Sequence, residues 1–348
     1  MNKIKVGIAG YGIVGKRRRK VVDTNSNLKL VAICDRNIQA LKPSQNDGVT
    51  YHENFDEFLK EDLDAMIICL TNDVAAESTI KAVNRGIHVF CEKPPGKSAQ
   101  EVLQVMDAER LKPSIKVMYG FNHRYHESIK EGLKIASSNR LGKIINMRGV
   151  YGKSKLVTFD QDDWRTKREI AGGGVLLDQG IHMVDLMRLF AGEFDEVYSF
   201  IENTHWNYDV EDNVYALMKN KRNGVVAMLN SSATQWRHRF NLEVNFENGG
   251  LIFGGILSGS KSYGAETLTI IESDHELDNG DPKEITIKYN KDKSWEEEIH
   301  LFSEAIKNNE DIKSGSSLDA LNTMKLVNEI YYADDLWRYK YDIRRISI

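Results

Sequence analysis

The first 120 or so residues alternate short apolar runs with stretches of helical periodicity. The apolar runs are rich in Ile, Val and Cys and show no polar alternation; they are Ile4–Ala9, Leu28–Cys34, Ala65–Leu70, His88–Cys91 and Ile115–Tyr119. The helix-like stretches between them are Val14–Val22, Val74–Asn84 and Ala99–Leu111. Strands that are apolar on both faces and alternate with helices predict a parallel sheet covered by helices on both sides.

The pattern changes after residue 121, where polar alternation and turn signals become frequent. Strand-like runs follow one another at Ile144–Tyr151, Glu196–Asn203, Tyr215–Lys219, Val225–Ser231, Phe240–Phe246, Leu251–Phe253, Leu268–Ile271 and Glu284–Tyr289. Sequences such as Arg222-Asn223-Gly224 mark turns between them. These runs predict a mostly antiparallel sheet with a helix near Val175–Phe190 and a helical tail at Trp295–Lys307 and Ser317–Trp337. We therefore expect two domains, residues 1–121 and 122–348, with the tail helices returning to the first.

A glycine-rich turn follows the first predicted strand and opens the first helix. It reads Gly10-Tyr11-Gly12-Ile13-Val14-Gly15. Gly10 would permit the tight turn, Gly12 the approach of a pyrophosphate, and Gly15 close packing of helix on strand, while Ile13 and Val14 would offer free N–H groups. Asp35 ends the second strand 20 residues after Gly15, the spacing of a ribose-binding acid. The loop predicts dinucleotide binding; a purely structural turn is the alternative.

The residues around Asp35 bear on the choice of cofactor. A carboxylate here can accept from both ribose hydroxyls and would repel a 2′-phosphate, so Asp35 favours NAD. Arg36 could receive that phosphate, so NADP stays open.

Charge and cysteine content exclude several classes of protein. Lys and Arg number 47 against 51 Asp and Glu, a net charge of −4 that gives no global attraction to nucleic acid or anionic membrane. We interpret the basic run at residues 16–20 as a solvated or phosphate-facing helix surface. No apolar run approaches the about 20 residues that span a bilayer. Cys34, Cys69 and Cys91 are odd in number and widely spaced, which argues against disulfides or zinc and favours a reducing, cytoplasmic location.

Two segments carry candidate catalytic residues. The fifth strand ends in Glu92-Lys93-Pro94, where ligands of an open α/β sheet bind, so Lys93 could assist deprotonation of a hydroxyl. An ordinary loop lysine is the alternative. In the run from Gly172 onward, Asp178, His182 and Asp185 fall at i, i+4 and i+7 and share one helix face.

A carboxylate one turn from an imidazole can orient a general base. Three alternatives compete with that interpretation: Asp178 serves the helix start, Asp185 pairs with Arg188, and His182 is a core histidine. We expect no metal, because no further cluster of Cys or His supports one.

Taken in order, these motifs resemble the glucose–fructose oxidoreductase/inositol dehydrogenase/rhizopine catabolism family. The resemblance rests on the Gly10–Gly15 loop, Glu92-Lys93-Pro94, Gly120-Phe121-Asn122-His123-Arg124, the Gly172–His182 run and Ser317-Leu318-Asp319-Ala320 in the tail. It covers nearly the whole chain. It implies an α/β Rossmann domain followed by an α+β domain with a large, mostly antiparallel open sheet, which commonly supports homodimers or homotetramers.

The resemblance also implies an activity and roles for residues. It implies an NAD(P)-dependent dehydrogenase of a sugar, nucleotide sugar or inositol-like polyol, with His182 as base and Lys93 and Asp178 assisting. Glu92, Lys93 and Asn122 would lie beside the cofactor and Arg124 beside the substrate. An NAD-dependent glycoside hydrolase of the same fold and a non-catalytic sugar-sensing regulator are the alternatives.

The chain departs from the family pattern at two places. After the fourth strand the family often has Thr-Pro-Asn-x-x-His, whereas this chain has Thr71-Asn72 without the Pro and His. Of this motif, only Thr71 and Asn72 are therefore expected near the cofactor. Pro95-Gly96 follows the Glu-Lys-Pro motif where Leu is usual, so we expect a different shape of that loop.

Two segments combine aromatic and basic residues that suit a sugar with an anionic group. They are Asp162-Asp163-Trp164-Arg165 and Trp236-Arg237-His238. We expect Trp164, Arg165, Trp236 and His238 to contact substrate, together with Arg124, Asp178 and His182. Burial of the two tryptophans in the sheet core is the alternative.

Overall fold

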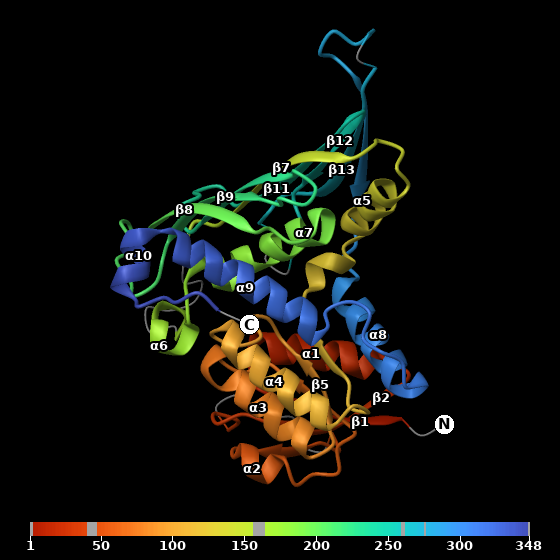
Figure 1. Cartoon of the computed structure of the whole chain (residues 1–348). Coiled ribbons are helices and arrows are strands. Elements are labelled where there is room, and N and C mark those ends of the chain that lie inside the picture. Colours follow the sequence, from red (N-terminus) through yellow and green to blue (C-terminus); the bar gives the residue numbers. More distant parts are fainter. Residues whose placement is uncertain (1–2, 40–46, 156–163, 259–261, 275, 347–348) are drawn as a thin grey trace. The chain divides into compact units, whose positions relative to one another are not determined.

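The computed structural model describes residues 3–39, 47–155, 164–258, 262–274 and 276–346. The chain divides into two compact units, which are treated separately (Figure 1). The first comprises Met1–Asn122 and Trp295–Leu321, and the second His123–Ser294 and Asn322–Ile348. The helical tail thus contributes to both units. A single domain boundary at residue 121 does not describe this division. No helix of the described residues has the length and hydropathy needed to cross a bilayer.

Among the described residues, the first unit forms a six-stranded parallel sheet in the order β3-β2-β1-β4-β5-β6. Its strands are β1 Ile4–Ala9, β2 Leu28–Cys34, β3 Thr50–His52, β4 Ala65–Ile68, β5 His88–Cys91 and β6 Val117–Tyr119. Its helices are α1 Ile13–Thr24, α2 Phe55–Phe58, α3 Asn72–Asn84, α4 Ala99–Leu111 and α8 Ser294–Asn308. The five predicted strands and three predicted helices are confirmed, whereas the short β3 and α2 were not predicted.

The basic run on α1, residues 16–20, is not exposed at every position, contrary to the expectation of a helix surface. Arg18 is fully buried, and its guanidinium donates from Nε to Glu92 Oε1 (2.6 Å) and from Nη2 to Glu298 Oε1 (2.5 Å). It also lies over the rings of Phe90 and Trp295, at 4.5 and 4.1 Å from their centroids. The surface interpretation is therefore wrong for Arg18. The physical reason is periodicity, because Arg18 shares the buried face of α1 with Gly15, Val21 and Val22.

In the part of the second unit that the structure describes, eight strands form one sheet in the order β14-β13-β12-β11-β7-β10-β9-β8. They are β7 Ile144–Gly152, β8 Glu196–Glu202, β9 Asn213–Lys219, β10 Val226–Ser232, β11 Arg239–Phe246, β12 Gly249–Gly254, β13 Glu266–Glu272 and β14 Lys283–Tyr289. Within these strands only the β7–β10 pair is parallel. The predicted, mostly antiparallel sheet is confirmed.

Helices cover one face of this sheet. They include α5 Glu127–Ser137, which packs on β12 and β13, and α7 Ile181–Ala191, which packs on β7 and β10 (Figure 1). The long α9 Ser317–Ala333 reaches β8, where the Ser199 hydroxyl donates to the carbonyl of Ile330. The short α6 Arg168–Ala171 and α10 Asp335–Lys340 complete the α-helices of the unit's described part.

The opposite face of the sheet bears exposed apolar side chains on neighbouring strands. Tyr198 and Phe200 of β8 lie opposite Leu217 and Tyr215 of β9, and all four are more than half exposed. Met228 of β10 continues the row beside Leu217. The sheet is therefore open on one side, as the resemblance implies.

The buried arginine gives a direct test of the first unit. We expect Arg18→Met to lower its stability by about 3–5 kcal/mol, because Glu92 and Glu298 would keep buried charge without its cation. Lys20→Met, on the exposed face of the same helix, should change stability by less than about 0.5 kcal/mol. Urea unfolding of the two full-length variants measures the difference, and equal midpoints would contradict a structural role for the buried ion pairs.

Candidate functional site

The predicted cofactor residues of the first unit gather at one edge of its sheet. All six strands are parallel, so the loops that follow them emerge together. These loops carry Gly10–Gly15 after β1, Asp35 and Arg36 after β2, Thr71 and Asn72 after β4, Glu92 and Lys93 after β5, and Asn122 after β6. The strand order reverses between β1 and β4, and such a switch point is where open α/β sheets bind ligands.

The three glycines of the loop are in different steric surroundings. Gly10 has φ of +87°, and a Cβ there would lie 2.3 Å from the carbonyl oxygen of Cys69. A Cβ on Gly15 would lie 2.0 Å from the carbonyl oxygen of Gly10. A Cβ on Gly12, in contrast, would meet no described atom within 4 Å. Backbone packing thus requires Gly10 and Gly15, while Gly12 leaves open space where a ligand can approach the chain.

The start of α1 is suited to an anion. Gly12 is the N-cap and, in this fully described helix, neither a capping side chain nor an acidic residue occupies the first turn. The helix N–H groups around Ile13 and Val14 therefore present partial positive charge to the open space at Gly12. The loop fits the pyrophosphate of a dinucleotide.

Asp35 is fixed against this loop. Its Oδ2 accepts from the Tyr11 N–H at 2.7 Å, and its Oδ1 accepts from the Asn37 N–H at 2.9 Å. Each carboxylate oxygen can accept a second hydrogen bond, so ribose hydroxyls can still be bound. Arg36 is exposed beside it.

Four other cofactor candidates have mixed surroundings. The Glu92 carboxylate is paired with the buried Arg18 guanidinium, so its negative charge has a counter-ion within the protein. The Thr71 hydroxyl donates to Asp73 at 2.5 Å, and Asn72 is buried in the first turn of α3. Lys93 is half-buried directly after β5.

In the second unit, Asp178 lies in a cationic environment. Lys153 Nζ donates to its Oδ2 at 2.9 Å, and Arg165 Nε lies 3.4 Å from its Oδ1. Asp178 belongs to a π-helical turn, Leu176–Gly180, which precedes α7 where the sequence predicted one continuous helix. Lys153 was not predicted as a site residue, although its position just after the apolar end of β7 was a possible signal.

His182 lies in the first turn of α7 and stacks on a second imidazole. The rings of His182 and His123 are 3.7 Å apart at their centroids and 10° from parallel, and both side chains are buried. His123 Nε2 is hydrogen-bonded to the Tyr151 hydroxyl at 3.0 Å. Burial raises the pKa of Tyr151 well above its ordinary value, so this hydroxyl stays protonated at neutral pH.

Asp185, the third residue of the predicted face, belongs to a different ion pair. Arg124 donates to it from Nε at 2.7 Å and from Nη2 at 2.6 Å, and the Thr323 hydroxyl donates at 3.0 Å. The alternative partner Arg188 is 4.0 Å away and binds Glu193 at 2.5 Å. This buried, bidentate pair fixes the Arg124 guanidinium against α7, and the substrate contact of Arg124 stays a prediction.

A buried carboxylate that the sequence did not single out fixes the start of the Asp178 segment. Glu211 accepts from the Gly174 N–H at 2.8 Å, the Leu176 N–H at 3.0 Å and the Tyr331 hydroxyl at 2.7 Å. Burial raises the pKa of Glu211, while the bond from Tyr331 and the charge of Arg168 oppose that rise. These bonds satisfy N–H groups that a helix start leaves without intrahelical partners.

The aromatic and basic candidates lie outside the sheet core. The Arg165 guanidinium stacks on half-buried Trp164 at 4.5 Å, and Trp236 is 65% exposed, so neither tryptophan is a core residue. His238 is hydrogen-bonded through Nε2 to Ser154 at 2.9 Å and through Nδ1 to Ser262 at 2.8 Å. Burial and the charge of Lys153 lower the pKa of His238, which favours its neutral form. Asp162 and Asp163 lie outside the described residues.

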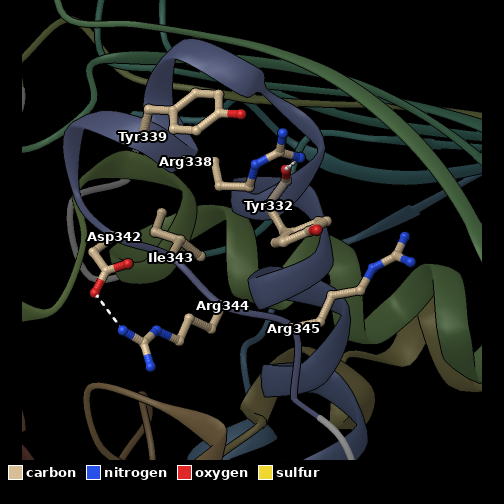
Figure 2. Close-up of a pocket in the computed structure, with 7 residues that line it drawn as sticks. All are labelled: Tyr332, Arg338, Tyr339, Asp342, Ile343, Arg344 and Arg345. Carbon is tan, nitrogen blue, oxygen red and sulfur yellow. Dashed lines mark hydrogen bonds and ion pairs between the residues drawn. The ribbon is translucent and has the colours of Figure 1, made fainter.

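A separate hollow near the end of the chain is not this site. Figure 2 shows it beside α9 and α10, with a volume of about 340 Å³; it is lined by Tyr332, Arg338, Tyr339, Asp342, Ile343, Arg344 and Arg345. Its arginines are paired with Asp335, Asp342 and Glu329 at 2.6 to 3.2 Å. Local pairing therefore neutralises much of its positive charge, and none of the predicted site residues lines it.

Comparisons with known protein families agree with a dinucleotide-binding first unit. Residues 4–121 match the model of an oxidoreductase family with an NAD-binding Rossmann fold, and residues 131–252 match the GFO/IDH/MocA C-terminal domain. The chain belongs to the Gfo/Idh/MocA family of oxidoreductases. Its first unit is the NAD-binding domain of that family.

Similar members of this family are named as sugar and polyol dehydrogenases. D-glucoside 3-dehydrogenase of Escherichia coli K12 is 26% identical over 268 residues, 70% of this chain and 74% of that protein. Glucose-6-phosphate 3-dehydrogenase of Bacillus subtilis strain 168 is 29% identical over 194 residues, 55% of each chain. The matched part thus spans about half of some of these relatives. A levoglucosan dehydrogenase solved with NADH and levoglucosan has the same fold, with a TM-score of 0.84 at 20% identity over 97% of this chain and 98% of that one.

The steric difference between the loop glycines yields a matched pair of variants. Gly12→Ala should fold like the wild type but bind NAD at least about tenfold more weakly, because its methyl group fills the space left for the pyrophosphate. Gly10→Ala should lose about 1–3 kcal/mol of stability, because its φ and the Cys69 carbonyl both oppose a side chain. Calorimetric titration with NAD and thermal unfolding measure the two effects, and unchanged NAD affinity in Gly12→Ala would count against the cradle.

Proposed function

We propose that the chain is an NAD(P)-dependent dehydrogenase that oxidises a hydroxyl, or reduces a keto carbon, of a sugar, nucleotide sugar or inositol-like polyol. The observation that carries the proposal is the Asp178–His182 segment, where a carboxylate in contact with two cations precedes an imidazole by one turn. The named dehydrogenases among its relatives support the same class of reaction.

The proposed chemistry divides between cofactor and protein. When bound, the nicotinamide accepts or supplies the hydride. His182 takes the proton from the substrate hydroxyl as general base. Asp178, which is paired with Lys153 and Arg165, accepts a hydrogen bond from the substrate. Lys93 assists by hydrogen bonding to the reacting oxygen.

Asp35 supports NAD as the preferred cofactor. Its carboxylate is fixed by two backbone N–H groups and cannot rotate away from a 2′-phosphate without breaking them. Exposed Arg36 keeps NADP as the second choice.

The charges near Asp178 support a substrate with an anionic group. Lys153 and Arg165 together carry one positive charge more than Asp178, and His238 is held neutral. Trp164 stacks on Arg165, while exposed Trp236 could cover a sugar face. One relative is named for a phosphorylated sugar. We therefore favour a sugar phosphate, sugar acid or nucleotide sugar over a neutral inositol.

A spectrophotometric assay tests activity and substrate class together. Purified protein with NAD or NADP is mixed with inositols, hexoses, sugar phosphates, sugar acids and nucleotide sugars, and reduced nicotinamide is followed by absorbance. We expect turnover with one anionic class, lowered at least about 100-fold in His182→Ala and Lys93→Ala, because removing a positioned acid–base group typically costs that much.

The controls of this assay separate the alternatives. Arg222→Ala, at an exposed turn, should keep full activity. Preference for neutral inositols would refute the anionic substrate. Glycoside cleavage without net formation of reduced cofactor, or sugar binding without turnover, would refute the dehydrogenase itself.

We also propose that the open sheet face binds a second copy of the chain, giving a homodimer or homotetramer. Tyr198, Phe200, Tyr215 and Leu217 form a contiguous exposed apolar group on β8 and β9, and such patches on a soluble domain mark association sites. A symmetric dimer would place this face against itself.

Light scattering after gel filtration tests this association. Phe200→Glu combined with Leu217→Lys should convert the oligomer to a monomer, because charge would be buried at the interface. Tyr339→Glu, at an exposed position on α10, is the matched control and should keep the wild-type mass. A monomeric wild-type protein would rule the proposal out.

A further inference from the structure

His123, which was not among the predicted catalytic residues, stacks on His182 in the second unit. We propose that His123 is a positioning residue that keeps His182 neutral and able to accept a proton, an inference that rests on the proposed role of His182 as general base. It acts through the shared stack and does not itself touch the substrate.

The geometry places the two rings close enough for their protonation to be coupled. The centroids are 3.7 Å apart and the planes are nearly parallel at 10°, so two imidazolium ions would hold like charges in van der Waals contact. Both side chains are buried, where water screens that repulsion poorly. A proton on either ring therefore disfavours a proton on the other, and the two rings titrate as a coupled system.

The surroundings fix His123 in the stack. From β7, the Tyr151 hydroxyl is hydrogen-bonded to His123 Nε2 at 3.0 Å, and from β11 the Phe240 ring lies edge-on at 5.9 Å. The His123 ring thus packs against Phe240 and is hydrogen-bonded through Nε2 to Tyr151. Its ring is held parallel to His182 by contacts from two different strands.

The charged groups near the stack are themselves paired. His126 lies edge-on to His123 at 5.5 Å, and its Nδ1 is 2.8 Å from Glu266 Oε2 of β13, with Asp292 at 3.9 Å from its Nε2. Arg124 is paired with Asp185 of α7, and Lys153, after β7, with Asp178. Among the described residues, His123 is the titratable side chain whose ring stacks directly on His182.

The consequence is a wider working range for the base. As pH falls, the first proton taken up is shared between two rings, so His182 stays neutral in part of the singly protonated molecules. Its full protonation requires a second proton against the repulsion of the first. The acidic limb of kcat/KM should therefore lie at lower pH than it would for an isolated imidazole, which titrates near its ordinary pKa of about 6.5.

Imidazole NMR titration tests the coupling without needing a substrate. The Cε1–H signal of His182, assigned by its loss in His182→Asn, is followed with pH in the full-length wild type, His123→Phe and His123→Gln. Phe keeps a stacked ring without a titrating group, and Gln keeps a polar partner for Tyr151, so one variant suffices if the other fails to fold. We expect the His182 midpoint to rise by about one pH unit in either variant.

Kinetics and a control complete the experiment. The acidic limb of kcat/KM should move to higher pH by the same amount, whereas His300→Gln, at an exposed position on α8, should leave both midpoints unchanged. An identical His182 midpoint in wild type and His123 variants would overturn the inference. A shifted midpoint without turnover on any substrate would uphold the coupling and overturn the dehydrogenase.

Discussion

The arrangement of the candidate catalytic residues in the second unit depends on one buried carboxylate. Glu211 accepts two backbone N–H groups and one hydroxyl at the point where the Gly172–Gly174 run becomes helical. A Cβ on Gly174 would lie 2.1 Å from the Glu211 carbonyl oxygen, so this close approach needs a glycine. The glycine run is therefore closely packed against the segment that carries Glu211. It sets where the π-helical turn begins, and with it the direction of Asp178 and His182.

Hydrophobic periodicity predicted the fold because burial follows it closely in this chain. Each predicted strand of the first unit is a strand with mostly buried side chains, and the surroundings of Gly10, Gly12 and Gly15 agree with the steric role predicted for each glycine. The short β3 was missed because three residues carry too little pattern. Helix α5 was missed for a different reason: its apolar stripe follows directly on the Asn122–Tyr125 turn without an apolar strand to frame it.

The structural role of a residue that contacts a partner far away in the sequence could not be predicted from periodicity. Arg18 looks like any member of a basic run until Glu298, 280 residues later, is placed against it. Lys153 and Glu211 are charged residues next to strands, a position that usually faces water. His123 was part of a quoted motif, yet only folding shows that its ring covers His182. Sequence periodicity indicates which face of a helix or strand is buried. It does not indicate which charged group or ring from a distant segment packs against that face.

The two acids that share the predicted helix face illustrate how burial separates similar residues. Asp185 is 1% exposed and bound by a bidentate arginine and a hydroxyl, so its oxygens are committed to holding α7 in place. Asp178 is 26% exposed, and of its cations one is a single lysine at hydrogen-bond distance and the other an arginine at 3.4 Å. A lysine is a point charge that can be shared with an incoming oxygen more readily than a planar, bidentate arginine can. Spacing alone made these acids equivalent; solvent exposure and the type of counter-ion are the reasons why we propose Asp178, and not Asp185, as the acid that contacts the substrate.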